Sequence, residues 1–320
     1  MNGFKRFWRI IIVMAAALLA LGAASAVRAD EPQPIIVVAG DTAPAQAATA
    51  DEEDPPPAPN ALEYDYDIYV SAPGNGVYGA ITYADEDVLR YTTKTGAWVK
   101  VFDGTNEGLP AAADIDALAF KTIDLGQVYY LSFDAPVAVP GLGTVDDSDV
   151  VAHTYVFGQG ATWSLFFDGS AHGLTTDGED VDAIEVDGST LYLSTAAGFS
   201  VPKVGGGTLK GADEDVFVFA SQANAFGLWR DGGNIGLTAT NNVRGFAFMR
   251  YADDDIAFYV TQRAAQLKQP NSSYAAVALS PNDIGVEERH FAGPTYFGVL
   301  LDASAAGFPK VDAVDLVKKN

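Results

Sequence analysis

The sequence contains no cysteine and only three histidines, and its 19 lysine and arginine residues stand against 42 acidic ones. Without cysteine the chain has neither disulfide bonds nor a thiol nucleophile, so the hydrophobic core alone must hold the fold. The formal net charge of −23 argues against nucleic acids and anionic membranes as partners, because both require cations on the protein. The same charge favours cations or basic partners.

Several catalytic patterns are also missing. The chain has no G-x-S-x-G nucleophile elbow, no P-loop and no EF-hand loop. His153, His172 and His290 do not recur at matching positions, which is typical of surface or turn residues rather than of a catalytic base. Beyond residue 60 no segment keeps helical spacing without glycine or proline, so no long helix is expected there. We therefore expect binding rather than catalysis, and predict no catalytic residue.

The first 61 residues have the composition of an export signal and a linker. Residues 1–29 combine basic residues, an apolar run from Ile10 to Leu21 and an A-x-A pattern at 24–26, which predicts a secretory signal peptide. The run is shorter than the ~20 residues of a spanning helix, so we expect cleavage and no membrane span afterwards. Residues 30–61, rich in alanine, proline and acids, predict a disordered linker. The expected location is the periplasm, the cell surface or the medium.

Residues 62–320 repeat one pattern four times, with copies 61 to 71 residues apart. The first landmark, a pair that opens an apolar run, is Asp-Ala at three of its four places and Arg244-Gly245 at the other. Each copy also contains a run that ends in a hydroxyl residue, an aspartate before a β-branched residue, and an aromatic followed five positions later by aspartate. The third copy, 180–237, shows the pattern most clearly, and the last copy departs most. The recurring aromatics are Trp98, Trp163, Phe226 and Phe297. Their recurrence predicts packing between repeats, whereas Trp229 stands outside this register.

The repeated runs have the composition of β-strands. Valine, isoleucine and aromatic residues dominate them, turn-forming residues separate them, and Asp187-Gly188 is a strong hairpin signal. Four strands in each of four units predict an all-β fold, a closed four-bladed β-propeller of four-stranded antiparallel blades. The alternative is a stack or sandwich of four antiparallel β modules.

The two ends of the repeat region complement each other. The first unit begins at its second strand (67–71), and the chain finishes with a first strand (311–317). We expect these terminal strands to pair and close the ring, because closure removes an exposed sheet edge. The connectors between second and third strands vary most in sequence, so we expect ligand specificity there: 72–84, 133–146, 196–212 and 262–280.

Aspartates gather at the strand ends that strand parity places on one face of the propeller. We expect the repeated pairs to form an acidic face, and they are candidate ligands for Ca²⁺, a cation that prefers several carboxylate oxygens. The alternative, which repetition in every unit favours, is that they bond backbone N–H groups of their own turns. The candidate metal ligands are Asp85, Asp87, Asp114, Asp116, Asp147, Asp149, Asp180, Asp182, Asp213 and Asp215.

The blocks 167–170, 173–174, 180–184, 191–194 and 213–216 resemble repeats of uncharacterised bacterial secreted proteins. Those proteins alternate FDGSD-x-GL and D-[VIL]-DA-[IL] blocks with LYLST and ADEDV blocks. The resemblance covers residues 62–250 well, and implies a bacterial exported repeat protein with a propeller-like fold, without implying an activity.

These observations together predict an exported, monomeric, non-catalytic propeller that binds or scaffolds through its acidic face. Its partner would be a protein or glycan outside the cytoplasm. Two alternatives stay open: a secreted propeller hydrolase that acts on glycans with a pair of carboxyl groups, and a surface or adhesion module that Ca²⁺ stabilises.

Overall fold

The computed structural model describes residues 60–250, 254–268, 275–290, 295–307 and 310–319. All described residues belong to one compact unit within Asp54–Asn320. The predicted signal peptide and nearly all of the predicted linker lie outside the described residues. Within the described part, no helix is long and apolar enough to cross a lipid bilayer.

Four antiparallel four-stranded sheets form the blades of a propeller, as predicted from the repeats. From the axis outward, blade 1 contains β24 (Ala313–Lys318), β1 (Tyr66–Ser71), β4 (Val88–Thr92) and β5 (Ala97–Phe102). Blade 2 contains β6 (Ile115–Ile123), β7 (Gly126–Phe133), β10 (Val150–Val156) and β11 (Gly160–Phe167). Blade 3 contains β12 (Val181–Asp187), β13 (Thr190–Thr195), β16 (Val216–Ala220) and β17 (Ala225–Arg230). Blade 4 contains β18 (Val243–Arg250), β19 (Asp254–Thr261), β22 (Ile284–His290) and β23 (Thr295–Leu301).

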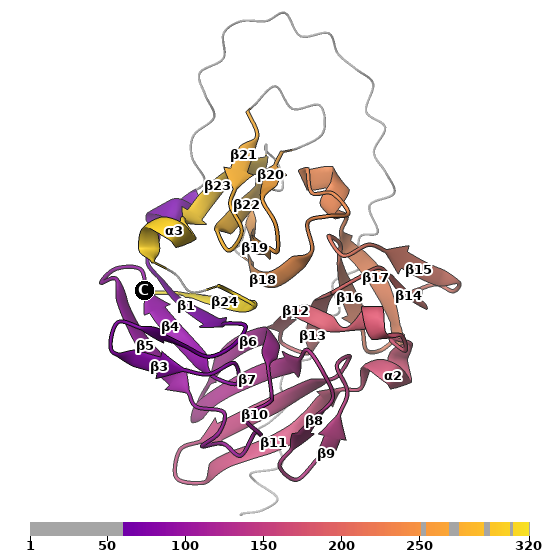
Figure 1. Cartoon of the computed structure of the whole chain (residues 1–320). Coiled ribbons are helices and arrows are strands. Elements are labelled where there is room, and N and C mark those ends of the chain that lie inside the picture. Colours follow the sequence, from indigo (N-terminus) through magenta and orange to yellow (C-terminus); the bar gives the residue numbers. More distant parts are fainter. Residues whose placement is uncertain (1–59, 251–253, 269–274, 291–294, 308–309, 320) are drawn as a thin grey trace, which may run out of the picture. The chain divides into compact units, whose positions relative to one another are not determined.

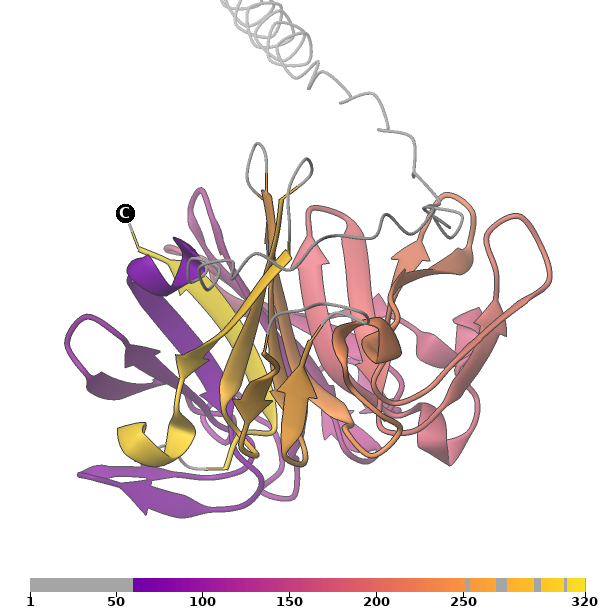
Figure 2. The ribbon, with the colours of Figure 1, turned by 90° about the horizontal axis from the view of Figure 1, so that it is seen from above.

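The C-terminal strand closes the ring, which confirms the predicted pairing of the terminal strands. β24 runs antiparallel to β1 in an unbroken register from Tyr66↔Lys318 to Ser71↔Ala313. It thereby supplies the innermost strand that the first sequence repeat lacks. The strands β24, β6, β12 and β18 pack against one another around the axis, at the centre of the view in Figure 1. Figure 2, turned by 90° from Figure 1, shows the sheets of the blades side by side.

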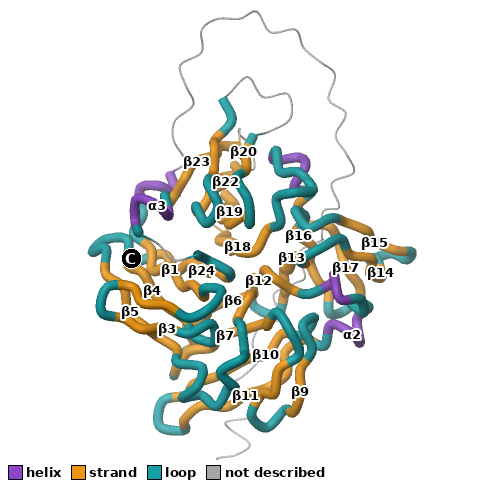
Figure 3. The backbone as a smooth tube through the Cα atoms, viewed as in Figure 1, coloured by secondary structure: helices purple, strands orange, loops and turns teal. Residues whose placement is uncertain are grey.

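Each connector between the second and third strands folds into a small hairpin, which the sequence did not predict. Their strands are only three or four residues long and pair with each other rather than with the blades (Figure 3). They are β2 (Gly76–Tyr78) with β3 (Ile81–Tyr83), β8 (Val137–Val139) with β9 (Gly143–Val145), β14 (Phe199–Pro202) with β15 (Thr208–Gly211), and β20 (Ala265–Leu267) with β21 (Val277–Leu279). Every repeat therefore holds six strands instead of four.

Among the residues that the structure describes, helical structure is limited to single turns. Those within the ring mostly follow the outermost strand of a blade: α2 (Gly169–His172), η2 (Asp177–Glu179), η3 (Gly232–Ile235) and α3 (Ala303–Ala306), while η1 (Asn60–Glu63) precedes β1. The recurring aromatics pack in the apolar clusters of the fold, as predicted, with Phe226 fully buried and Trp98, Trp163 and Phe297 at the cluster edges. Trp229 also packs, against Tyr192 and Phe246.

Candidate functional site

One group of predicted acids gathers where the innermost strands begin. Asp116 and Asp182 each occupy a register shift in the pairing of the innermost strand, in β6 and β12. Such bulges redirect a side chain from the face of the sheet. In blade 4 the matching residue is Arg244, and before β24 it is Asp312. We name Asp114, Asp116, Asp180, Asp182 and Asp312 the axial cluster.

The axial acids raise one another's pKa values. Burial, followed by the charges of Asp312 and Asp134, raises the pKa of Asp114 to about 7. Burial and the charge of Asp147 raise the pKa of Asp180 to about 7, against the opposing effect of a hydrogen bond with Asp116. Burial also lifts the pKa of Asp116 well above its usual range, with neighbouring aspartates adding to the shift. These groups lie close enough for the charge of one to disfavour ionisation of the next.

Deeper in the cluster, Asp182 is almost completely buried and has one partner of known geometry. Asn242 Nδ2 donates to Asp182 Oδ2 at 2.6 Å, and burial raises the pKa of Asp182 well above its usual range. The other oxygen of Asp182 is buried without a hydrogen-bond partner, as is one oxygen each of Asp114 and Asp116. A buried carboxylate oxygen without a donor is costly unless a proton or a cation reaches it.

Among the described residues, Arg244 is the cation that forms an ion pair with this cluster, at Asp312. Its guanidinium lies 3.2 Å from Asp312 Oδ1, and the pair is mostly buried. One guanidinium does not balance five carboxyl groups. The axial cluster therefore has more carboxyl groups than cations, and protons or an added cation would balance the excess negative charge.

Glu185 and Asp315, which lie farther along the innermost strands, have partners for both of their carboxylate oxygens. Lys121 forms an ion pair with Glu185, and the backbone N–H of Phe248 donates to the second Glu185 oxygen at 3.3 Å. Asp315 accepts from the backbone N–H groups of Phe120 at 2.6 Å and Leu316 at 2.7 Å. The contacts of Lys121 with Glu185, of Phe248 with Glu185 and of Phe120 with Asp315 cross between blades, so these acids join the innermost strands.

The aspartates that open the third strands belong to a turn instead. One oxygen of Asp149 accepts from Asp146 N at 2.9 Å, and the other accepts from Gly169 N at 3.0 Å. The same two bonds occur at the other three repeats, at Asp87, Asp215 and Asp283. Both carboxylate oxygens are thus engaged by backbone donors, and the turn-forming interpretation holds for Asp87, Asp149 and Asp215.

A glycine permits this turn in three of the blades. A Cβ at Gly104, Gly169 or Gly232 would lie 2.1–2.3 Å from a backbone carbonyl of the turn that holds the third-strand aspartate. The missing side chain lets the N–H of this glycine reach the carboxylate. Blade 4 uses Ala303 at the matching bond.

Asp85, Asp147 and Asp213 connect neighbouring blades through their backbone. Their carbonyl groups accept from Ile115 N at 3.0 Å, Val181 N at 3.1 Å and Val243 N at 3.0 Å, where the next innermost strand begins. Burial raises the pKa of the Asp85 and Asp147 carboxyls, with the charges of neighbouring acids adding to the shift. Asp85 and Asp147 lie near the axial cluster, since their charges act on Asp114 and Asp180.

No three histidine, aspartate or glutamate side chains among the described residues surround a common point closely enough to hold a metal ion directly. Of the ten candidate metal ligands, the structure brings Asp114, Asp116, Asp180 and Asp182 together. It assigns Asp87, Asp149 and Asp215 to turns and places Asp85 and Asp147 beside the cluster. The tenth candidate, Asp213, contacts the start of blade 4 through its backbone carbonyl.

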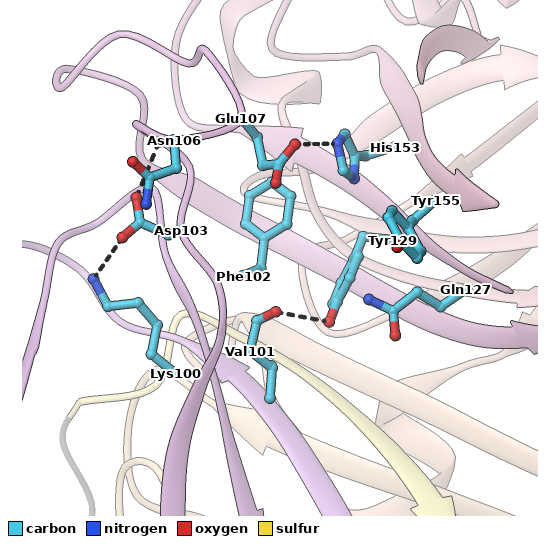
Figure 4. Close-up of a pocket in the computed structure, with 10 residues that line it drawn as sticks. All are labelled: Lys100, Val101, Phe102, Asp103, Asn106, Glu107, Gln127, Tyr129, His153 and Tyr155. Atoms are coloured by element: carbon cyan, nitrogen blue, oxygen red, sulfur yellow. Dashed lines mark hydrogen bonds and ion pairs between the residues drawn. The ribbon is translucent and has the colours of Figure 1, made fainter. Parts of the chain in front are cut away.

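A cavity of about 370 Å³ lies between blades 1 and 2 and contains none of these predicted ligands (Figure 4). It is lined mainly by polar and aromatic side chains, among them Asp103, Asn106, Glu107, Gln127, His153 and Tyr155. Glu107 Oε2 lies 2.9 Å from His153 Nε2, and the Glu107 carbonyl accepts from the Trp163 indole at 3.1 Å. Burial lowers the pKa of His153 although Glu107 opposes the shift.

The sequence does not predict this cavity, because its residues come from three separate segments. Glu107 follows β5 in blade 1, whereas Gln127 and His153 belong to β7 and β10 of blade 2. The one signal in the sequence is that His153 does not recur, a pattern that predicts a surface or turn position. The structure shows instead that His153 is buried, with 3% of its surface exposed.

No family model and no curated protein matches this sequence. Among solved structures, the chain is similar to one in the nidogen/laminin complex at 10% identity, with a TM-score of 0.34, over 79% of this chain and 98% of that chain. A protein from Lactobacillus plantarum is similar at 10% identity, with a TM-score of 0.33, over 79% and 99%. At this identity the likeness concerns the fold alone.

Proposed function

We propose that this protein is a non-catalytic binding propeller, exported from the cytoplasm, that takes up a cation at the axial cluster. The observation that carries the proposal is the set of buried, unpartnered oxygens of Asp114, Asp116 and Asp182 beside a single paired guanidinium. The ammonium group of a basic ligand would relieve this excess of negative charge. A metal ion such as Ca²⁺ would relieve it as well, but it would need to draw the carboxyl groups closer together, since no three of those described surround a common point. The N-terminal signal pattern supports export.

A catalytic function on glycans receives less support from the structure's acidic residues. A hydrolase of that class needs an acid and a second carboxylate on either side of the bond it cleaves. The cavity contains Asp103 and Glu107, but Asp103 recurs in every repeat and also caps a turn through Asn106 N. Glu107 alone breaks the fourfold pattern, so the cavity does not supply a unique carboxyl pair.

The proposal is tested by calorimetry and thermal melts of the full chain at pH 8 with Ca²⁺, Mg²⁺ or spermidine, and with a chelator. Binding by either metal identifies an inorganic cation, and binding by spermidine alone identifies an organic one. The Asp114→Asn/Asp180→Asn variant should lose the binding. The exposed pair Asp124→Asn/Asp177→Asn removes the same charge and should retain it. Melts and titrations that are unaffected by all three cations would reject the proposal.

A further inference from the structure

We propose that the cavity between blades 1 and 2 is a binding site for a neutral saccharide unit. The proposal is independent of the axial cluster, since the two sites share no residue. Three observations support it: the chemistry of the lining, an aromatic strip beside the cavity, and a combination of residues that occurs in only one blade.

The one lysine of the lining is already engaged within the protein. Lys100 Nζ lies 2.6 Å from Asp87 and 3.4 Å from Asp103, so its ammonium group is engaged. Glu107 bonds to His153, whose pKa is lowered by burial, so this imidazole adds no positive charge at neutral pH. The lining therefore offers no uncommitted cation for a phosphate or carboxylate ligand.

The remaining lining groups suit a ligand with many hydroxyls. The amides of Asn106 and Gln127 and the phenol of Tyr155 each combine hydrogen-bond donors with acceptors. The volume of about 370 Å³ lies near the lower end of the range of ligand pockets, roughly 300–1,000 Å³. A single sugar ring with its hydroxyls matches both the size and the polarity.

Register places the cavity residues of blade 2 on one face of the sheet. Tyr155 pairs with Gln127, and His153 pairs with Tyr129 in the same β7–β10 ladder. Residues two apart on a strand point to the same side, so all four face blade 1. Figure 4 shows these side chains entering the cavity next to Phe102 and Glu107.

An exposed apolar strip continues from this row. Phe157 is 80% exposed and Leu125 is 67% exposed, and the Phe157 backbone N–H bonds to the Leu125 carbonyl at 2.8 Å. The rings of Tyr155 and Phe157 meet edge to face, with centroids 6.4 Å apart. Large exposed apolar side chains that adjoin a polar cavity mark a binding surface. Rigid aromatic rings suit the C–H faces of sugar rings, and hydroxyls of the same sugar reach the amides.

The combination is specific to this blade. Counted from the turn aspartate of each repeat, the positions of His153 and Tyr155 hold Tyr91 and Thr93 in blade 1, Phe219 and Ser221 in blade 3, and Glu287 and Arg289 in blade 4. Counted instead from the aspartate that follows each outermost strand, which is Asp103 in blade 1, the position of Glu107 holds His172, Ile235 and Ala306 in the other repeats. A set of residues that departs from the repeat at this one interface points to specificity rather than to construction of the fold.

The test uses saturation-transfer NMR and calorimetry on the full chain with a panel of neutral sugars: glucose, galactose, mannose, N-acetylglucosamine, cellobiose and chitobiose. We expect saturable binding of at least one sugar. Tyr155→Ala and Gln127→Ala should each weaken it at least tenfold. Ser221→Ala, the position in blade 3 that matches Tyr155, is the control and should bind as the parent chain does. The Asp114→Asn/Asp180→Asn variant should also retain sugar binding.

Tetramethylammonium serves as the competing probe, because an aromatic and acidic cavity could instead hold an organic cation. Saturable binding of tetramethylammonium that Tyr155→Ala abolishes, without binding of any sugar, would overturn the proposal. The absence of saturable sugar binding across the panel would overturn it as well, and so would sugar binding that neither cavity variant weakens. The melting temperatures of the variants are measured as well. If they stay close to that of the parent chain, a loss of binding is due to the changed cavity and not to unfolding.

Discussion

The aspartate that opens each third strand joins two turns through both of its carboxylate oxygens. In blade 2, Asp149 accepts from backbone donors on either side of β10, at Asp146 and Gly169. Asparagine offers only one acceptor oxygen, so Asp149→Asn leaves one buried N–H without a partner. We expect a loss of about 1–3 kcal/mol of unfolding free energy, measured by urea denaturation.

Asp124→Asn is the matched control, because Asp124 lies exposed in a hairpin turn. It should change the unfolding free energy by less than about 0.5 kcal/mol. Equal losses in the two variants would contradict the turn assignment.

At the residue scale, the sequence predicted the turn acids better than the acids of the axis. Repetition at Asp87, Asp149 and Asp215 indicated a structural function because a unique site does not recur in every unit. The pairing of His153 with Glu107 could not be predicted, since the two residues meet only when the segment after β5 packs against blade 2. Sequence spacing contains no information on such a contact.

At the scale of elements, β24 is the strand on which ring closure depends. Val314 and Leu316 of this strand are buried, and its whole length pairs with β1. A chain that ends at residue 309 would expose the edge of β1 and lose the innermost strand of blade 1. We expect the shortened chain to aggregate or to unfold without a single cooperative transition, as measured by size-exclusion chromatography and circular dichroism.

A peptide of residues 310–320, added in trans, should restore part of the monomeric fraction. A chain that lacks only residue 320 is the control for truncation. If the chain that ends at 309 stayed monomeric with the melt of the parent protein, closure by β24 would not stabilise the ring.

The four main strands of each blade were predictable because each is five to nine residues long and lies between turn signals. The extra hairpins were not, because strands such as Val137–Val139 and Gly143–Val145 are too short to show alternation. The first three hairpins also contain glycine, which favours the interpretation as loops.

At the scale of the whole molecule, the axial cluster makes stability depend on pH. The pKa of Asp114 and that of Asp180 are raised from 3.8 to about 7 in the folded state. Between these values the folded chain holds more protons than the unfolded chain, so the axial contribution to unfolding free energy falls as pH rises from about 4 to about 7. Asp114→Asn/Asp180→Asn should remove much of this decline and raise the melting temperature at pH 8 by several degrees.

Thermal melts of the parent chain and the double variant at pH 5 and pH 8 check this expectation. The difference between the two proteins isolates the axial groups from every other titrating residue. Melting temperatures that fall by the same amount in both proteins would show that these carboxyl groups titrate normally.

We infer that a cation and protons compete for the axial cluster. Calorimetric titration at pH 7 in two buffers of different ionisation enthalpy measures the protons released when the cation binds. With the cation that binds best at pH 8, we predict a net proton release at pH 7, a much smaller release at pH 8.5, and no binding heat in Asp114→Asn/Asp180→Asn. Cation binding without proton release at pH 7, or with undiminished heat in the double variant, would contradict the claim.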